Sequence, residues 1–248
     1  LSPSSAASDV YKRQLLCSEI LIAIYRFLPL LQNRLYMAKL YINKDIVADK
    51  DKMENWYLTG EEGLSFPDIQ NFLSWIDPND HVIDIEIHSC GGDAVEGYAI
   101  YDALRASGKQ ISCTAVGRCA SMATVILLAA AKERRFAYPH AKFLIHKPYM
   151  ASYDGDLDLE TLESIKSNLE SEKNKMLALY VERTGSEASV IEAQMNKAGW
   201  FGGETAKQLG FITTVLMPTT AKGRTYTFNN KKMNKEKEVT AVSYTHLR

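Results

Sequence analysis

The pattern of apolar and polar residues changes its period several times between residues 80 and 217. Over 81–88 three isoleucines alternate with polar residues, which predicts a strand with one buried face. The next segment, 94–107, has helical spacing and stops at Gly108, so it predicts a helix. The side chains expected to face the core from this helix are Val95, Tyr98, Ala99 and Leu104.

The alternation of strand and helix continues through the rest of this region. Residues 111–116 predict a second strand, and the run GRCASMATVILLAAA that follows predicts a turn and a helix buried on all sides. A third strand ends at His146, ahead of Pro148, which cannot extend a central ladder. Further helices are predicted over 158–183, 190–197 and 203–209. This order predicts an α/β domain with a largely parallel sheet.

The two ends of the chain differ in composition from the region between them. The first and last segments, LSPSSAASDVYKRQ and VSYTHLR, resemble translated sequencing adapter. The apolar stretch over 15–31 contains Glu19, Arg26 and Pro29, whereas a membrane span needs about 20 residues with few charges. The predicted division is therefore upstream read-through or a leader over 1–36, a folded domain over 37–217, and a polar, basic tail over 218–248.

The overall composition is typical of a soluble globular domain. The 248 residues are 46% apolar with a formal net charge of -1 and no sustained basic face, so we expect no nucleic-acid binding. The four cysteines form no CxxC pair and the histidines no HExxH motif, which favours reduced thiols in the cytoplasm and no metal site. We expect no cofactor, and the chain contains no GxxxxGK[ST] phosphate loop of its own.

Two residues at the predicted carboxyl edge of the sheet are candidates for nucleophilic catalysis. Ser121 lies at the turn into the buried helix, where the N–H of Met122 has no helical partner and the helix dipole favours negative charge. His146 ends a later strand, and Gly91 and Gly92 end the first one, at the same edge. A serine nucleophile needs such a base and such oxyanion donors. By pattern alone, however, a serine at a helix start is more often an N-cap.

Three segments resemble the Clp protease proteolytic subunit in order and spacing. They are SCGGDAVEGYAIYDALR, GRCASMATVILLAAAKERRFAYPHAKFLIHKP and ETAKQLGFI, which resemble the family's SPGG loop, ASM turn, IHxP histidine and EAxxxG segment. The resemblance implies the α/β fold of that family and of crotonases, with repeated β-β-α units and a long protruding handle helix. By position it implies Ser121 as nucleophile, His146 as base, and Gly92 and Met122, with Gly91, as oxyanion donors.

Two positions depart from the pattern of this family. Cys90 replaces the proline of the SPGG loop, and the position of the acidic triad member falls on Ala198. Asn196 is close in sequence, and its amide oxygen could accept the histidine N–H, as in Cys-His-Asn sites. Further candidates for the third member are Glu192 and Asp154. A cysteine nucleophile at Cys90 or Cys119 is a minor alternative.

The resemblance favours a serine endopeptidase that acts on protein or peptide substrates, with activity reduced by the absent acid. The segment EEGLSFPDIQNFLSWI resembles the phage-borne members of the family that mature the capsid head, so capsid proteins are expected partners. The alternatives are a pseudo-protease that acts as an assembly scaffold and a crotonase-type acyl-CoA enzyme. The helix over 158–183 resembles the family's handle between rings, so we expect a ring-forming homo-oligomer, and an ATP-driven unfoldase on a separate chain is a further candidate partner.

Overall fold

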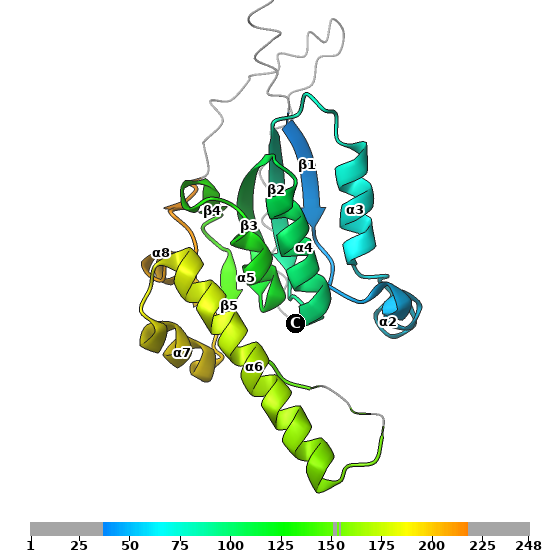
Figure 1. Cartoon of the computed structure of the whole chain (residues 1–248). Helices are drawn as coiled ribbons and strands as arrows, with labels where there is room; N and C mark the ends of the chain where they lie inside the picture. Colours follow the sequence, from blue (N-terminus) through cyan, green and yellow to red (C-terminus); the bar gives the residue numbers. More distant parts are fainter. Residues whose placement is uncertain (1–36, 151–152, 154, 218–248) are drawn as a thin grey trace, which may run out of the picture. The chain divides into compact units, whose positions relative to one another are not determined.

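The structure is a computed structural model that describes residues 37–150, 153 and 155–217. The segments that the sequence sets apart as leader and tail, 1–36 and 218–248, lie outside the described residues. The described chain forms an α/β domain around one largely parallel sheet, with helices packed against it (Figure 1). The predicted fold class is therefore confirmed.

The described residues contain seven strands in one sheet. They are β1 (Met37–Ile42), β2 (Val82–Ser89), β3 (Gln110–Ala120), β4 (Arg135–Ala137), β5 (Lys142–Leu144), β6 (Phe201–Gly202) and β7 (Thr214–Val215). The hydrogen-bonded order is β1-β2-β3-β4-β7, while β5 pairs with the end of β3 in parallel and with β6 in antiparallel orientation. Because β2, β3 and β5 run parallel, their carboxyl ends lie at one edge of the sheet, which is where α/β folds place their sites.

The helices connect these strands and cover the sheet (Figure 1). They are α2 (Lys52–Thr59), α3 (Phe66–Trp75), α4 (Ala94–Ala106), α5 (Met122–Leu127), α6 (Leu159–Thr184), α7 (Ala188–Lys197) and α8 (Gly203–Gln208), with 3-10 turns η1 (Asp49–Asp51) and η2 (Lys132–Arg134). Helix α4 packs between α3 and α5. A Cβ at Gly97 of α4 would lie 2.6 Å from Met122 Cε, so the glycine permits this close approach. All residues of α5 are buried, which confirms the prediction of a helix surrounded by protein.

Three details of the sequence prediction are wrong. Val95 was expected to face the core, but its side chain is 76% exposed, because the face of α4 that meets α5 is the one that carries Gly97. The residues before Ser121 were expected to form a turn, yet β3 continues to Ala120 after a register shift opposite Ile87 and Ser89. The third strand ends at Leu144 rather than at His146.

Helix α3 begins at a capping box that the sequence analysis did not identify, although the residues Ser65 to Asp68 with a proline between them are its usual signal. The Asp68 carboxylate accepts from the Ser65 N–H at 2.9 Å and lies 2.7 Å from Lys52 Nζ of α2. Burial alone would raise the pKa of Asp68, but these hydrogen bonds outweigh burial and hold the pKa below its ordinary value. Lys52 Nζ also lies 3.0 Å from Asp49, so this lysine ties α2 to the body of the domain.

The long helix α6 is attached to the domain through its carboxyl-terminal half. Its buried residues are Met176, Tyr180 and Thr184, and the rest of the helix projects away from the sheet (Figure 1). This confirms the protruding handle helix. Its base is fixed by Arg135, which is only 1% exposed and donates to the carbonyls of Ala130 at 2.9 Å and Arg183 at 2.7 Å. None of the helices in the described part of the chain is long and apolar enough to cross a membrane.

Candidate active site

The backbone at Ser121 is strained where β3 turns into α5. Its φ of 52° and ψ of -127° lie in a region that residues other than glycine rarely adopt, and among the described residues only Ala198 shares a positive φ without being glycine. The Ser121 N–H donates to the carbonyl of Leu144 at 2.8 Å, at the end of β5. Its carbonyl accepts from Thr124 N–H at 2.9 Å and from Thr124 Oγ1 at 2.6 Å. The turn is therefore held on both sides.

A buried hydroxyl pair links this turn to the handle helix. Thr124 Oγ1 lies 2.7 Å from the Tyr180 hydroxyl of α6. Because Thr124 donates its proton to the Ser121 carbonyl, the Tyr180 hydroxyl is the donor in this pair. Complete burial raises the pKa of Tyr180 well above its ordinary value, so the hydroxyl keeps the proton that it donates.

The glycine pair after β2 lies directly against the serine turn. Gly91 has a φ of 87°, and a Cβ there would lie 2.6 Å from the Ala120 carbonyl oxygen and 2.7 Å from Met122 N. Gly92 has a φ of 145°, and a Cβ there would lie 2.0 Å from the Ile46 carbonyl oxygen. Both positions therefore require glycine, for the backbone conformation and for space.

The N–H groups of this loop differ in their hydrogen bonds. The Gly91 N–H donates to Ser89 Oγ at 3.0 Å. Among the described residues neither the Gly92 N–H nor the Met122 N–H has an acceptor. These two N–H groups are consequently the ones that can receive a developing oxyanion, while Gly91 contributes the close approach.

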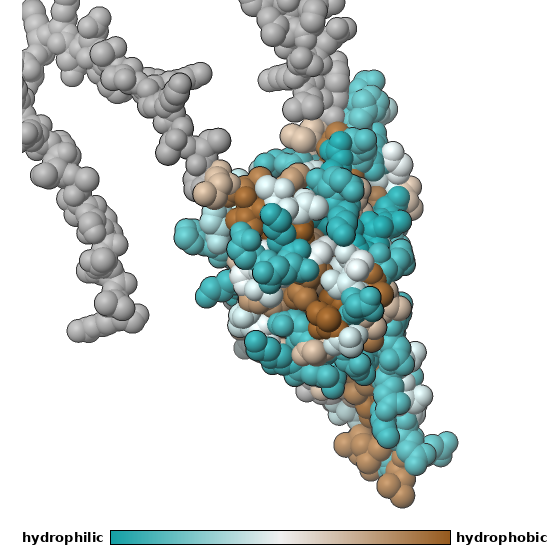
Figure 2. Space-filling view, turned by 90° about the vertical axis from the view of Figure 1, so that its left-hand side faces the viewer, coloured by the Kyte–Doolittle hydropathy of each residue, from teal (hydrophilic) through white to brown (hydrophobic). Residues whose placement is uncertain are grey.

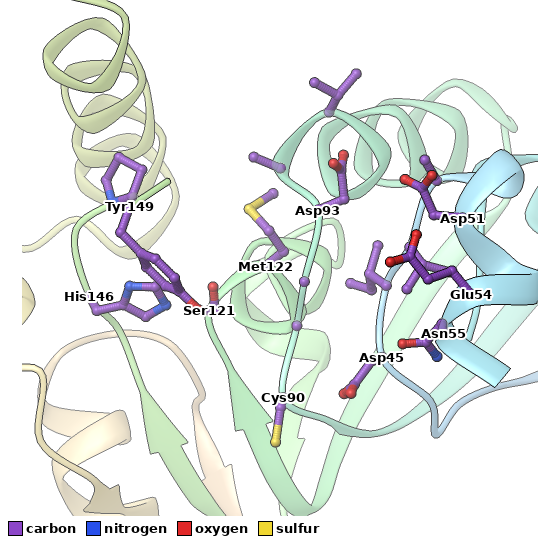
Figure 3. A pocket seen from close by; sticks show the side chains of 18 of the residues that line it. Asp45, Asp51, Glu54, Asn55, Cys90, Asp93, Ser121, Met122, His146 and Tyr149 are labelled. Carbon is purple, nitrogen blue, oxygen red and sulfur yellow. The ribbon is translucent and has the colours of Figure 1, made fainter. Parts of the chain in front are cut away.

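The imidazole of His146 lies beside Ser121, two residues beyond the end of β5 (Figure 3). Its Nδ1 is 2.6 Å from the carbonyl oxygen of Lys147. A carbonyl oxygen can only accept, so Nδ1 carries the proton in this contact and Nε2 is left as the basic nitrogen. The ring of Tyr149 packs against the imidazole with 5.5 Å between ring centroids. The histidine is thus held in the tautomer that a general base requires.

One pocket brings the predicted catalytic residues together. Its cavity volume is about 740 Å³, within the range of ligand-binding clefts. The sequence-predicted residues that line it are Ser121, His146, Gly91, Gly92 and Met122. A nucleophile, a base and two N–H donors in one cleft are the groups that acyl transfer needs.

The candidates for a third catalytic member lie elsewhere. Asn196 is exposed on α7 and does not line the pocket. Glu192 pairs with Lys173 Nζ, which lowers the pKa of that carboxyl, and Asp154 lies outside the described residues. In the described structure the Nδ1 of His146 has a backbone carbonyl as its partner instead of a side chain.

Ala198, the position where the family resemblance expects the acidic member, lies outside the sheet. It is the carboxyl cap of α7, with a φ of 46°, and its side chain is exposed. The chain re-enters the sheet at Phe201, which pairs with Phe143 of β5. Ala198 does not line the pocket that contains His146.

The cysteines of the described residues are free thiols. Cys113 and Cys119 are fully buried, and burial raises the pKa of Cys113 to about 12 and that of Cys119 well above its ordinary value, so neither is a reactive thiolate. Cys90 lines the pocket, but its sulfur points away from Ser121 (Figure 3). The described residues contain no group of three or more His, Cys, Asp or Glu side chains that could hold a metal ion.

Sequence reasoning missed four carboxylates that also line this pocket. They are Asp45, Asp51, Glu54 and Asp93. Figure 3 shows Asp45, Asp51 and Glu54 across the loop from Ser121 and His146, with Asp93 between the two groups. No local motif identifies them, because three of them come from a segment that precedes the first predicted strand.

Comparison with known proteins assigns the chain to a family of peptidases. The family model for Clp protease matches residues 69–219, and the chain belongs to this family. The ATP-dependent Clp protease proteolytic subunit 1 of Chlamydia abortus is 30% identical over 149 residues, which cover 58% of this chain and 74% of that protein. The protein of the same name from Protochlamydia amoebophila is 28% identical over 149 residues, with 58% and 69% covered.

A solved structure supports the same fold. A ClpP1 mutant from Listeria monocytogenes aligns with a TM-score of 0.58 over 78% of this chain and 96% of that chain. The sequence identity of 20% means that this comparison concerns the fold alone. The resemblance found in the sequence motifs is therefore confirmed at the level of the family.

Proposed function

We propose that the protein is a serine endopeptidase in which Ser121 is the nucleophile and His146 the general base. The observation that carries the proposal is the strained backbone of Ser121 in the pocket that also contains His146. Strain of this kind is kept at functional sites, where the surrounding structure enforces it. Ser121 makes no side-chain capping hydrogen bond, which argues against the alternative of a simple N-cap.

In this mechanism each group has one task. Ser121 Oγ attacks the carbonyl carbon of the scissile peptide and gives its proton to Nε2 of His146. The negative charge that forms on the carbonyl oxygen is received by the N–H groups of Gly92 and Met122. His146 then protonates the leaving amine, and a water molecule, deprotonated by the same nitrogen, hydrolyses the acyl-enzyme.

We propose that the Lys147 carbonyl orients His146 in place of a carboxylate. A neutral carbonyl fixes the tautomer but stabilises the imidazolium less than a charged carboxylate does. In subtilisin, loss of the orienting Asp costs about 3 × 10⁴ in kcat, against about 2 × 10⁶ for loss of Ser or His. We therefore expect slow turnover, which suffices for the single processing of an abundant neighbouring protein.

The substrates that we propose are capsid proteins of a phage, and the assembly a ring-forming homo-oligomer. The first is supported by the resemblance of segment 61–76 to the phage-borne members of the family. The second is supported by apolar side chains at the far end of the handle, where Leu157, Leu159 and Leu162 are 59%, 81% and 47% exposed (Figure 2). Exposed apolar groups at the end of a projecting helix indicate a contact with another subunit.

Hydrolysis of an unfolded protein and of fluorogenic peptides by the full chain tests the proposal. We expect cleavage that is lost in Ser121→Ala and in His146→Ala. The matched controls are Ser74→Ala and His140→Ala, which change exposed residues outside the pocket and should leave the rate unchanged. A folded, oligomeric wild-type protein that cleaves nothing contradicts the proposal and favours a scaffold without activity.

A further inference from the structure

The side of the pocket opposite His146 is acidic. The carboxylates of Asp45, Asp51, Glu54 and Asp93 line it, and no Lys or Arg is among the described residues that do so (Figure 3). No ion pair joins any of the four to another described residue. Asp93 is partly engaged, because its carboxylate accepts the Glu96 N–H at 2.9 Å as the N-cap of α4. The uncompensated negative charge therefore faces the cleft.

The acidic wall is tied directly to the loop that receives the oxyanion. Ile46 N–H donates to the Gly91 carbonyl at 2.8 Å, and Asp93 N–H donates to the Ile46 carbonyl at 2.8 Å. The chain then leaves this position and returns at Leu64, whose N–H donates to the Asp45 carbonyl at 2.8 Å. This excursion, the segment between Asp45 and Leu64, contains η1 and α2, and Lys52 of α2 forms an ion pair with Asp68. Backbone hydrogen bonds thus place Asp45 and Asp93 beside the glycine loop, and the ion pair of Lys52 attaches the segment that carries Asp51 and Glu54.

Three of the four carboxylates of this wall, Asp45, Asp51 and Glu54, lie outside the matched family region, which contains only Asp93. The matched family region begins at residue 69, after the whole excursion. Residues 45–63 contain six acidic side chains and two basic ones, although the whole chain is nearly neutral. Neither η1, which contains Asp51, nor α2, which contains Glu54, has a buried residue, so packing of the core does not require these charges. Asp51 and Glu54 therefore have no role in core packing, and their charges can act on a substrate that enters the pocket.

We propose that this acidic wall makes the enzyme prefer substrates with a Lys or Arg side chain within a few residues of the scissile bond. The inference rests on the proposed function, since Ser121 defines where the substrate lies. An ammonium or guanidinium group beside Asp51 and Glu54 gains Coulomb energy, and an acidic side chain at the same place is repelled. The carboxylates are exposed, and exposed ion pairs are weak, so we expect a preference of about fivefold in kcat/KM.

A panel of N-acetylated fluorogenic peptides tests the inference on the full-length chain. One residue is varied at each position around the scissile bond among Lys, its neutral isostere norleucine, Gln and Glu. We expect the order Lys, then the neutral residues, then Glu at one or two positions. The preference should shrink between 0.05 M and 0.5 M salt, because added salt shortens the distance over which exposed charges interact.

Variants distinguish the wall from other sources of charge preference. In Asp51→Asn/Glu54→Gln the ratio of kcat/KM for the Lys peptide to that for the norleucine peptide should fall towards one. The matched control is Glu61→Gln/Glu62→Gln, which removes the same charge from the same excursion outside the pocket lining and should keep the ratio. Cleavage of neutral peptides without a preference for Lys overturns this inference and leaves the proposed function intact. Cleavage of none of the peptides overturns both.

Discussion

Replacement of Gly91 by alanine should lower the catalytic rate strongly and the stability of the fold only modestly. The positive φ of 87° costs a residue with a Cβ about 1–2 kcal/mol. The new methyl group would also lie 2.6 Å from the Ala120 carbonyl, and ordinary contact begins at 3.4 Å, so the backbone around Ser121 must move by about 0.8 Å. A misplacement of about 1 Å costs roughly 100-fold in rate, so we expect kcat/KM for a fluorogenic peptide to fall by about that factor.

A glycine with the same backbone strain provides the control. Gly108 has a φ of 70°, and no atom lies within 4 Å of a Cβ placed there. Gly108→Ala therefore introduces the backbone strain of a positive φ but no steric clash. We expect it to lose about 1 kcal/mol in urea unfolding and to keep wild-type kcat/KM. A folded Gly91→Ala protein with kcat/KM within about threefold of wild type would refute the reasoning that the glycine loop positions the nucleophile.

Three further predictions concern groups around the site. Ala198→Asp, which restores a carboxylate where the family resemblance expects the acidic triad member, should raise kcat by at least about tenfold, whereas Ala198→Gly should not; equal rates contradict the assignment of that position to Ala198. Thr124→Val leaves a buried hydroxyl without its partner and should lower the free energy of unfolding by about 1–3 kcal/mol, and adding Tyr180→Phe should cost less than the sum; additive losses in urea unfolding contradict this. Lys52→Met should destabilise the protein at pH 7, because the ion pair with Lys52 helps to hold the pKa of Asp68 below its ordinary value. The loss should be full above the unfolded carboxyl pKa of about 3.9 and should shrink as the pH falls below it through the lowered folded pKa; a difference in thermal unfolding that is as large at pH 2 as at pH 7 contradicts this.

The elements with a strong local pattern could be read from the sequence. The isoleucines of β2 and the apolar positions of the long helix α6 recur with the period of one conformation, and α5 lies in an apolar run that continues beyond the length of a short strand. The short strands β4, β6 and β7 could not be predicted, because two or three residues have no period and are defined only by the partner they pair with. Val95 was misplaced because the approach of α4 to α5, and not hydrophobicity alone, decides which face is buried.

The same distinction applies to the site. Ser121 and His146 stand next to signals that can be recognised locally, a turn into a helix and the end of a strand. The partner of His146 Nδ1 is a backbone carbonyl, which every residue has, so no sequence pattern identifies it. The acidic wall reaches the pocket through the pairing of Ile46 with the loop after β2, about 45 residues later in the chain, which is a tertiary contact that local periodicity does not report.

The central claim is that Ser121 is an activated nucleophile. The most direct measurement is labelling of the full chain with a fluorophosphonate probe, read by intact mass and peptide mapping, with Ser121→Ala and His146→Ala beside the wild type. The account predicts a single adduct on Ser121 that both substitutions abolish. A folded, oligomeric protein that takes up no probe, or an adduct that survives in His146→Ala at the wild-type rate, would contradict it.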